Sequence, residues 1–174
     1  MGDVGHNMNI FVVDEDPIVA ATMLCDKHNV KMILESAQML CSALPSARNY
    51  QMYNGVTLYK PTHTKHPCTL WAGKSHQNYQ WLLRHSVGLY CEYTQRYGKI
   101  HKSQHVIKVM AELEERCPLP DIGLTPFAQA MPEKYKDANA VVAYRNYYIG
   151  EKSKIAVWKH SIPPYWWSHR YGTS

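Results

Sequence analysis

The sequence is poor in charge and in phenylalanine, and it has no long apolar run. Charged side chains make up 19% of its 174 residues, and it holds only 2 Phe against 13 Tyr and 5 Trp. The densest apolar stretch, residues 30–44, is interrupted by Lys31, Glu35 and Gln38, so it falls short of the ~20 apolar residues that a membrane-spanning helix needs. The first residues lack the basic and apolar regions of a secretory signal. We therefore expect a globular protein of the cytoplasm with no membrane partner.

Signature motifs of several enzyme classes are also missing. The sequence has no GxGxxG, P-loop, GxSxG or HExxH motif, which argues against a dinucleotide-binding Rossmann protein, an NTPase, a serine hydrolase and a zinc protease. Its 5 Cys are scattered without a CxxC pair, as expected of reduced thiols. The run from His63 to Cys68 contains residues that could bind zinc. A structural zinc site needs four ligands, however, and no second pair stands out in the sequence. We therefore predict neither a metal site nor a cofactor.

The chain does carry a modest excess of positive charge. Lys and Arg number 19 against 14 Asp and Glu, which gives a formal net charge of +5 with ten His neutral. Positive charge attracts phosphates, and Tyr and Trp rings stack on bases. The composition thus favours DNA or a phosphorylated nucleotide as partner, and it gives no indication of an oligomeric state.

Proline, glycine and capping residues divide the chain into helices. Asp16 and Pro17 are typical of a helix start, and Gly98 is typical of a helix end. The expected helices cover residues 17–44, 68–97, 104–116 and 138–149, with Asp137 as the cap of the last. The fold class is therefore mainly α.

The remaining segments are expected to be loops. Residues 10–13 are a short β-like run, Asn54-Gly55 predicts a hairpin turn, and the prolines between 118 and 132 predict an extended crossing. We expect a flexible leader over residues 1–8. Residues 9–174 are expected to form a single-domain bundle of four or five helices with long Pro-rich loops.

A polar stripe follows the first expected helix. His28, Lys31, Glu35 and Gln38 recur at i, i+3, i+7 and i+10 between apolar neighbours. An imidazole titrates near neutral pH, an ammonium holds an anion or acts as an amine, and a carboxylate serves as acid or base. We predict that His28, Lys31 and Glu35 are catalytic residues in the wall of a cleft. The alternative is an exposed Lys31–Glu35 ion pair without a chemical role.

The second expected helix repeats the pattern with one unusual residue. Asn78 lies among apolar residues, and a buried amide needs hydrogen-bond partners. It either organises the core or binds substrate, and we predict the latter. Glu92 and Arg96 further along are simply interpreted as an i,i+4 ion pair.

Five basic residues are predicted to bind phosphate or substrate. Lys99, His101 and Lys102 precede the third expected helix, whose N-terminus favours an anion. Arg145 and Lys152 belong to a segment that interleaves basic residues with tyrosines, a composition that suits nucleic acid. The alternatives are a plain basic loop and a Tyr-rich packing helix.

Two blocks of the sequence are similar to uncharacterised proteins of tailed phages. The first is residues 9–38. The second consists of shorter motifs, which include His66-Pro67, Asn78-Tyr79, Glu92-Tyr93, residues 96–102, Thr125-Pro126, residues 129–132 and Tyr144-Arg145. This resemblance covers most of the chain but implies no known activity.

The chain also resembles, more weakly, the phage pyrimidine-dimer DNA glycosylases of the endonuclease V type. The order of expected elements is alike, with residues 131–137 before an Ala/Arg helix and an aromatic C-terminus. The resemblance implies a helical fold, an N-terminal α-amine as nucleophile, and a Glu and several Arg on the first helix. This chain differs, because residues precede Met8 and its helix carries Lys27, His28 and Lys31.

Taken together, these features predict a phage enzyme that acts on pyrimidine bases of DNA in the host cytoplasm. In a glycosylase/lyase, Lys31 attacks C1′ and Glu35 positions charge. In a transferase of thymine hypermodification, His28 or Glu35 deprotonates an incoming amine, and Lys31, Lys99, Lys102 and Arg145 hold the leaving phosphate. The alternatives are a non-catalytic binder of nucleic acid or of a nucleotide signal, and a structural protein.

Overall fold

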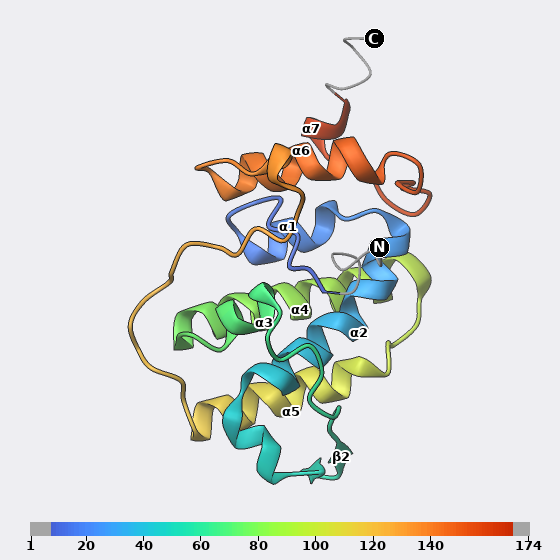
Figure 1. Cartoon of the computed structure of the whole chain (residues 1–174). Coiled ribbons are helices and arrows are strands. Elements are labelled where there is room, and N and C mark those ends of the chain that lie inside the picture. The colour runs from blue at the N-terminus through green and yellow to red at the C-terminus, as the bar shows by residue number, and fades with distance from the viewer. Residues whose placement is uncertain (1–7, 169–174) are drawn as a thin grey trace.

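The computed structural model of the chain is mainly α-helical and describes residues 8–168 (Figure 1). Its helices are α1 (Pro17–Met23), α2 (Asp26–Ala43), α3 (Pro67–Ala72), α4 (His76–Tyr97), α5 (Ser103–Arg116), α6 (Ala140–Lys152) and α7 (Tyr165–Ser168). Two 3-10 helices, η1 (Pro45–Asn49) and η2 (Glu133–Tyr135), and a hairpin of β1 (Met52–Tyr53) and β2 (Val56–Thr57) complete the described part. The expected leader lies outside the described residues except for Met8, whose side chain is buried.

The first expected helix is two helices. Asp16 caps α1 as predicted and accepts hydrogen bonds from the amides of residues 18 and 19. The prediction of one helix over 17–44 is wrong, because Leu24 and Cys25 have extended backbones. The Arg96 guanidinium stabilises the break by donating to the Thr22 carbonyl at 3.0 Å and the Leu24 carbonyl at 2.8 Å. These are carbonyls that a helix end leaves without helical partners.

The second expected helix is also divided, into α3 and α4. Gly73 ends α3 where a Cβ atom would lie 2.7 Å from the Ala43 carbonyl oxygen, so a side chain there would displace α2. Ser75 then caps α4 by accepting from the Asn78 amide at 2.9 Å. Gly98 ends α4 with φ 66°, which confirms the predicted left-handed stop.

Smaller differences separate the remaining predictions from the structure. Residues 10–13 are buried but form no strand, and Asn54-Gly55 forms the predicted hairpin turn. Helix α6 starts at Ala140 because Asn139, not Asp137, accepts from its first amides, and it continues past Gly150 to Lys152. Helix α5 begins at Ser103, one residue before its expected start.

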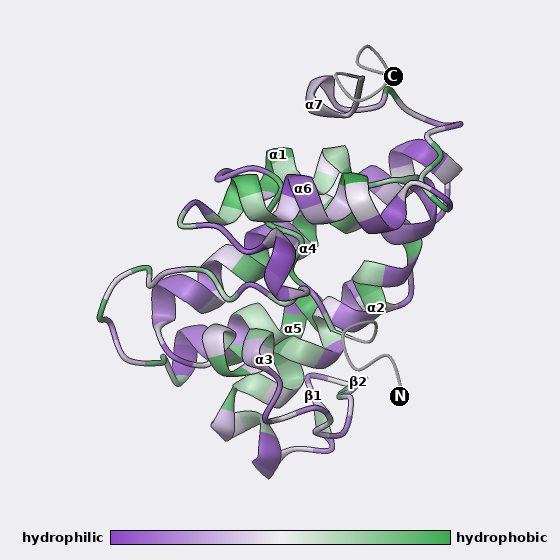
Figure 2. Ribbon diagram, turned by 45° about the horizontal axis from the view of Figure 1, so that its top comes forward, coloured by the Kyte–Doolittle hydropathy of each residue, from purple (hydrophilic) through white to green (hydrophobic). Residues whose placement is uncertain are grey.

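Helix α4 lies in the centre of the bundle, between α1 and α6 on one side and α2 and α5 on the other (Figure 1). A Cβ at Gly88 would lie 2.8 Å from the Ala21 Cβ, so glycine lets α1 approach α4 closely. Apolar residues gather where the helices meet (Figure 2), and the large tyrosines 79, 144 and 148 are fully buried among them. None of the described helices is both long and apolar enough to cross a membrane. A crossing segment (residues 117–139) joins α5 to α6 around the bundle.

Candidate active site

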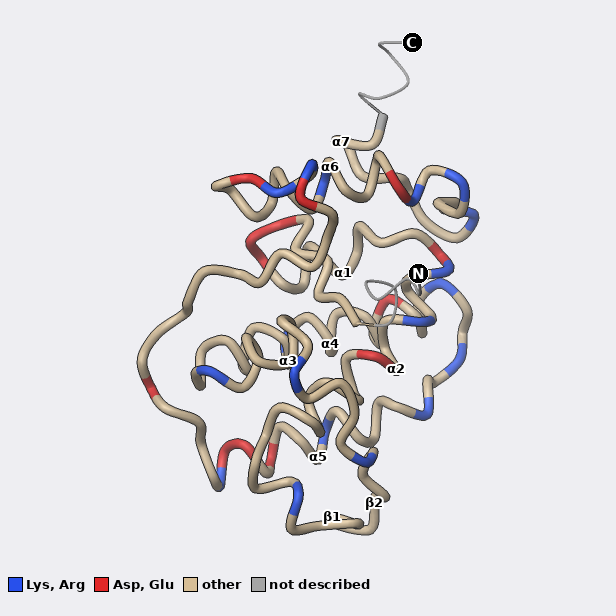
Figure 3. The backbone as a smooth tube through the Cα atoms, viewed as in Figure 1, with Lys and Arg blue, Asp and Glu red and all other residues tan. Residues whose placement is uncertain are grey.

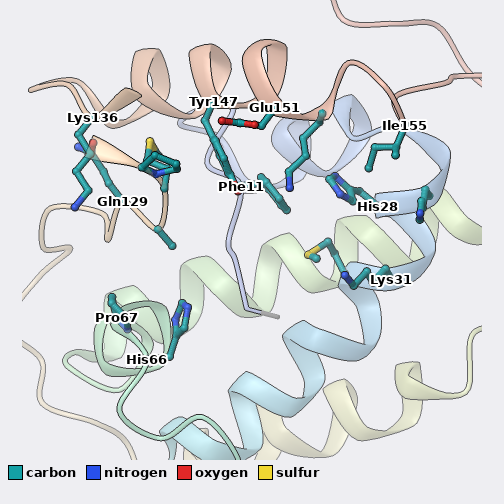
Figure 4. Close-up of a pocket in the computed structure, with 16 residues that line it drawn as sticks. Phe11, His28, Lys31, His66, Pro67, Gln129, Lys136, Tyr147, Glu151 and Ile155 are labelled. Atoms are coloured by element: carbon teal, nitrogen blue, oxygen red, sulfur yellow. The ribbon is translucent and has the colours of Figure 1, made fainter. Parts of the chain in front are cut away.

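A cavity of about 800 Å³ opens between α2, the start of α3, the crossing segment and α6 (Figure 4). Helix α2 supplies the residues at 27, 28, 31 and 32, and α6 supplies those at 147, 151 and 152. The crossing segment supplies residues 129–132 and Lys136, while Phe11, His66, Pro67 and Ile155 complete the lining. The cavity thus brings together segments that are more than 100 residues apart in the sequence.

The lining of the cavity is strongly basic. It contains four lysines and one carboxylate, namely Lys27, Lys31, Lys136, Lys152 and Glu151. The Glu151 carboxylate lies 3.8 Å from the Lys134 ammonium and accepts a hydrogen bond from the Tyr135 hydroxyl at 3.1 Å. Two of the lysines are paired as well, Lys136 with Glu133 at 2.6 Å and Lys31 with Glu35 at 3.7 Å. The lining and its paired groups together keep a net positive charge, which favours an anionic ligand.

His28 is a buried, neutral imidazole at the wall of the cavity. Its ring stacks on Phe11 with centroids 4.8 Å apart, and Nδ1 lies 2.9 Å from the Tyr148 hydroxyl. That hydroxyl accepts from the Cys25 amide, which leaves its own proton to donate to Nδ1, so we assign the imidazole proton to Nε2. Burial, followed by the charges of Lys152 and Lys31, lowers the pKa of His28 to about 3. His28 is therefore suited to donate a hydrogen bond.

Glu35 is a buried carboxyl linked to the cavity through Lys31. It lies one turn after Lys31 on α2, is 6% exposed, and places Oε1 3.7 Å from the Lys31 ammonium. Its other oxygen is buried without a hydrogen-bond partner among the described residues. Burial raises the pKa of Glu35 to about 7, although Lys31 and Lys152 oppose the rise. The Lys31–Glu35 pair anticipated as an exposed alternative exists, but its carboxylate is withdrawn from water.

Lys152 joins this group from α6. It is 9% exposed, and its ammonium lies 5.1 Å from the centre of the Tyr147 ring. Its charge acts on both His28 and Glu35. The structure therefore gathers four of the nine predicted site residues, with three at the cavity wall and Glu35 behind Lys31.

Asn78 does not line the cavity, because its amide is occupied by the protein. The amide nitrogen donates to the Trp71 carbonyl at 2.8 Å and to the Thr125 hydroxyl at 2.7 Å. The amide oxygen accepts from the Thr125 backbone at 2.9 Å. Asn78 thereby fastens the crossing segment to α4, which is the organising role that sequence reasoning had weighed against substrate binding.

Arg145 also lies outside the cavity lining. Its Nε donates to the Val13 carbonyl at 2.8 Å, and its guanidinium lies 3.5 Å from Asp14. The same group stacks over the rings of Tyr165 and Trp166. These contacts connect α6 with the N-terminal segment and the C-terminal aromatic residues.

Lys99, His101 and Lys102 lie on the loop between α4 and α5, apart from the cavity lining. Both lysines are exposed. His101 is half-buried, and its Nδ1 accepts from the Ser103 backbone amide at 3.1 Å. Burial, followed by the charge of Lys102, lowers the pKa of His101.

Sequence reasoning missed several residues of the cavity wall. Lys27 carried a usable signal, because it precedes Lys31 by four residues and so lies on the same side of the helix. Gln129, Lys136 and Glu151 carried no local signal, since they reach the cavity only through the path of the crossing segment and the placement of α6.

A comparison with protein families supports one of the two resemblances. The family model described as pyrimidine dimer DNA glycosylase matches residues 8–106, which is more than half of the chain. No curated protein and no solved structure gives a significant match. The match contains His28, Lys31 and Glu35 and stops within α5, whereas the crossing segment and α6 lie beyond it.

Proposed function

Because the chain belongs to the pyrimidine dimer DNA glycosylase family, we propose that it acts on DNA by drawing a pyrimidine nucleotide into the cavity and bonding to it through a lysine amine. The observation that carries the proposal is the pairing of two groups. The Lys31 ammonium lines the cavity, and the buried Glu35 carboxylate lies 3.7 Å from it. An amine beside its own proton acceptor is the arrangement that nucleophilic catalysis requires.

The size and walls of the cavity suit a nucleotide taken out of the base stack. An enzyme that modifies a base inside a duplex must extrude it into a pocket. The cavity of about 800 Å³ lies within the range of small-molecule sites. Phe11 and Tyr147 bring flat rings to its wall, with their planes 14° apart. These buried rings already stack on each other with centroids 6.3 Å apart, so they give the cavity an apolar wall against which a base can pack.

Lys31 must first lose a proton before it can attack. Glu35 is the natural acceptor, because its Oε1 lies 3.7 Å from the Lys31 ammonium. Its pKa, raised to about 7, makes it a stronger proton acceptor than an ordinary carboxylate. The transfer leaves a neutral amine and a neutral carboxylic acid, and the neutral acid is the form that burial favours. Glu35 therefore acts through Lys31 and does not need to touch the substrate.

Attack then exchanges one bond at C1′ for another. The Lys31 lone pair forms an N–C1′ bond while the C1′–N1 glycosidic bond breaks, and its electron pair moves onto the pyrimidine. The Nε2–H of neutral His28 can hydrogen-bond to the oxygen on which that charge develops. The new amine then loses a proton. The sugar ring opens, its O4′ takes up a proton, and an imine between Lys31 and C1′ remains. Lys152 is placed to hold a phosphate.

Borohydride trapping tests this chemistry, because reduction of the imine leaves a permanent protein–DNA bond. We expect trapping with duplexes that carry a pyrimidine dimer or an abasic site, and mass spectrometry should place the bond on Lys31. Lys31→Ala should abolish the adduct, whereas Lys108→Ala, at an exposed lysine of α5, should leave it unchanged. Glu35→Gln should slow trapping by about 100-fold. An adduct on the N-terminal amine, or trapping that survives Lys31→Ala, would contradict the assignment.

A second candidate, a transferase in thymine hypermodification, is favoured by the basic lining. The net positive charge of the lining suits a phosphate leaving group. An incoming amine would displace that phosphate from the carbon attached to C5 and would pass its proton to Lys31, whose own proton moves to Glu35. Of the four phosphate holders foreseen from the sequence, only Lys31 lines the cavity, so Lys27 and Lys152 would take over the role.

Nucleoside mass spectrometry separates the candidates. The protein is incubated with ordinary and with thymine-modified phage DNA, and the DNA is then digested to nucleosides. Loss of a pyrimidine base supports the glycosylase, whereas a new thymidine mass that depends on an added amine supports the transferase. Tight DNA binding with unchanged nucleosides and no trapped adduct would refute both candidates and would support a non-catalytic binder of DNA.

A further inference from the structure

The loop between α4 and α5 presents an apolar side chain between two lysines. Ile100 is 65% exposed, and Lys99 and Lys102 beside it are also exposed. Figure 3 shows this loop on the same side of the molecule as the N-terminal half of α2. Arg96 pairs with both Asp26 and Glu92, so this trio keeps one net negative charge against the two lysines of the loop.

The loop is held rigidly by its own hydrogen bonds. The Gly98 amide donates to the Thr94 carbonyl at 2.7 Å, and the Thr94 hydroxyl donates to the Lys99 carbonyl at 2.9 Å. His101 accepts from the Ser103 amide through Nδ1, and its ring packs edge-on against Tyr93 of α4 with centroids 5.2 Å apart. Ile100 is therefore exposed on a fixed turn and not on a loose loop.

The loop lies on the same side of the molecule as the part of α2 that lines the cavity (Figure 3). That part of α2 contributes Lys27, His28 and Lys31 to the lining. Val30 and Leu34 are 39% and 36% exposed on this part of α2. We call these three exposed residues, Ile100, Val30 and Leu34, the apolar ridge; Lys31 follows Val30, and Lys99 and Lys102 lie beside Ile100 in the sequence.

We propose that this ridge binds duplex DNA and that Ile100 enters the base stack next to the nucleotide that occupies the cavity. Apolar side chains are inserted between base pairs by proteins that open or kink a duplex, since stacked bases shield them from water. Lys99 and Lys102 would hold the flanking phosphates, and His101 would position the loop. The inference rests on the proposed function, because it takes the cavity as the place that receives the extruded nucleotide.

Fluorescence of 2-aminopurine placed next to the target pyrimidine tests the inference, because this base brightens when it is unstacked. Wild-type protein should raise the fluorescence of a bound duplex. Ile100→Ala should reduce that rise about fivefold while the affinity, measured by anisotropy, changes less than about threefold. Ile100→Phe should restore the rise. Ile122→Ala is the matched control, because Ile122 is 62% exposed and belongs to the crossing segment, which runs round the bundle away from the loop between α4 and α5 (Figure 1).

Each other outcome has a definite meaning. An unchanged fluorescence rise per bound complex in Ile100→Ala, or no rise with wild-type protein, would overturn the insertion. If wild-type protein fails to bind duplex at low salt but self-associates through Ile100, the ridge binds a second copy and the inference is wrong. Nucleoside analysis of the same samples reports on the chemistry separately. Duplex opening without any product refutes the proposed function and leaves the insertion intact.

Discussion

Replacing Glu35 by glutamine should make the protein more stable in alkaline solution and leave its stability in acid unchanged. Glutamine has nearly the shape of glutamic acid but carries no charge at any pH. The substitution therefore removes the cost of holding an ionised carboxylate in a site where Glu35 is 6% exposed and one of its oxygens has no hydrogen-bond partner among the described residues.

The size of the effect follows from the pKa of Glu35. Burial raises it from 4.5 to about 7, and the opposing attraction of Lys31 is already part of that value. One pKa unit corresponds to about 1.4 kcal/mol, so ionised Glu35 costs the folded state about 3 kcal/mol. For a chain of this length that free energy corresponds to roughly 6–12 °C in melting temperature.

The sign of the effect depends on which state binds the proton more tightly. Between pH 4.5 and 7 the folded protein keeps the proton on Glu35, whereas the unfolded chain has lost it. The contribution of Glu35 to stability is therefore fully present below pH 4.5 and is lost as the pH rises through 7. The stability difference between Glu35→Gln and wild type should be near zero at pH 4 and about 3 kcal/mol in favour of the variant at pH 8.

Urea denaturation of both proteins at pH 4, 6 and 8 measures this difference directly. Other groups whose pKa changes on folding, such as the buried imidazoles of His28 and His85, are common to both proteins and cancel. Glu115→Gln, at an exposed position of α5, should change stability by less than about 0.5 kcal/mol at any of these pH values. A pH-independent difference between Glu35→Gln and wild type would refute the reasoning. The same variant should lose activity, so stability and catalysis would change in opposite directions.

Three further predictions concern residues outside the cavity. Asn78→Ala breaks the hydrogen bonds to Trp71 and Thr125 and should cost about 2–4 kcal/mol of unfolding free energy, measured in urea. Arg96→Met should cost about 3–5 kcal/mol in the same assay, because it leaves two carboxylates and two helix-end carbonyls without their partner. Simultaneous replacement of Lys99 and Lys102 by Ala should lower the slope of log affinity against log salt by about 2 for duplex DNA, with an unchanged slope excluding phosphate contacts.

Local signals were enough to predict most helix ends. Asp16 and Gly98 fix their ends through contacts within a few residues, and such contacts can be read from the sequence. The break between α1 and α2 could not be predicted in this way. It depends on Arg96, a residue more than 70 positions away that supplies hydrogen bonds which the chain near Leu24 lacks.

The candidate site also contains residues that could be predicted from the sequence and residues that could not. His28, Lys31 and Glu35 could be grouped from the sequence because one helix spaces them at helical periodicity. Asn78 and Arg145 could not be assigned, since a polar residue among apolar neighbours can bind either a ligand or the protein itself. Here both bind the protein itself. Asn78 hydrogen-bonds to Thr125 of the crossing segment, and Arg145 hydrogen-bonds to Val13 of the N-terminal segment.

The two halves of the cavity also differ in their relation to the family. The matched span supplies the amine, the carboxyl and the imidazole from α2, whereas the opposite wall comes from the crossing segment and α6, beyond residue 106. The groups proposed to make bonds thus lie within the matched span, and Gln129, Lys136 and Lys152 lie beyond it. If the groups on α2 perform amine chemistry, we expect the wall formed by the crossing segment and α6 to decide which substituent the base carries when it enters. A substrate different from a pyrimidine dimer would therefore be selected by this wall, without any change to Lys31 or Glu35.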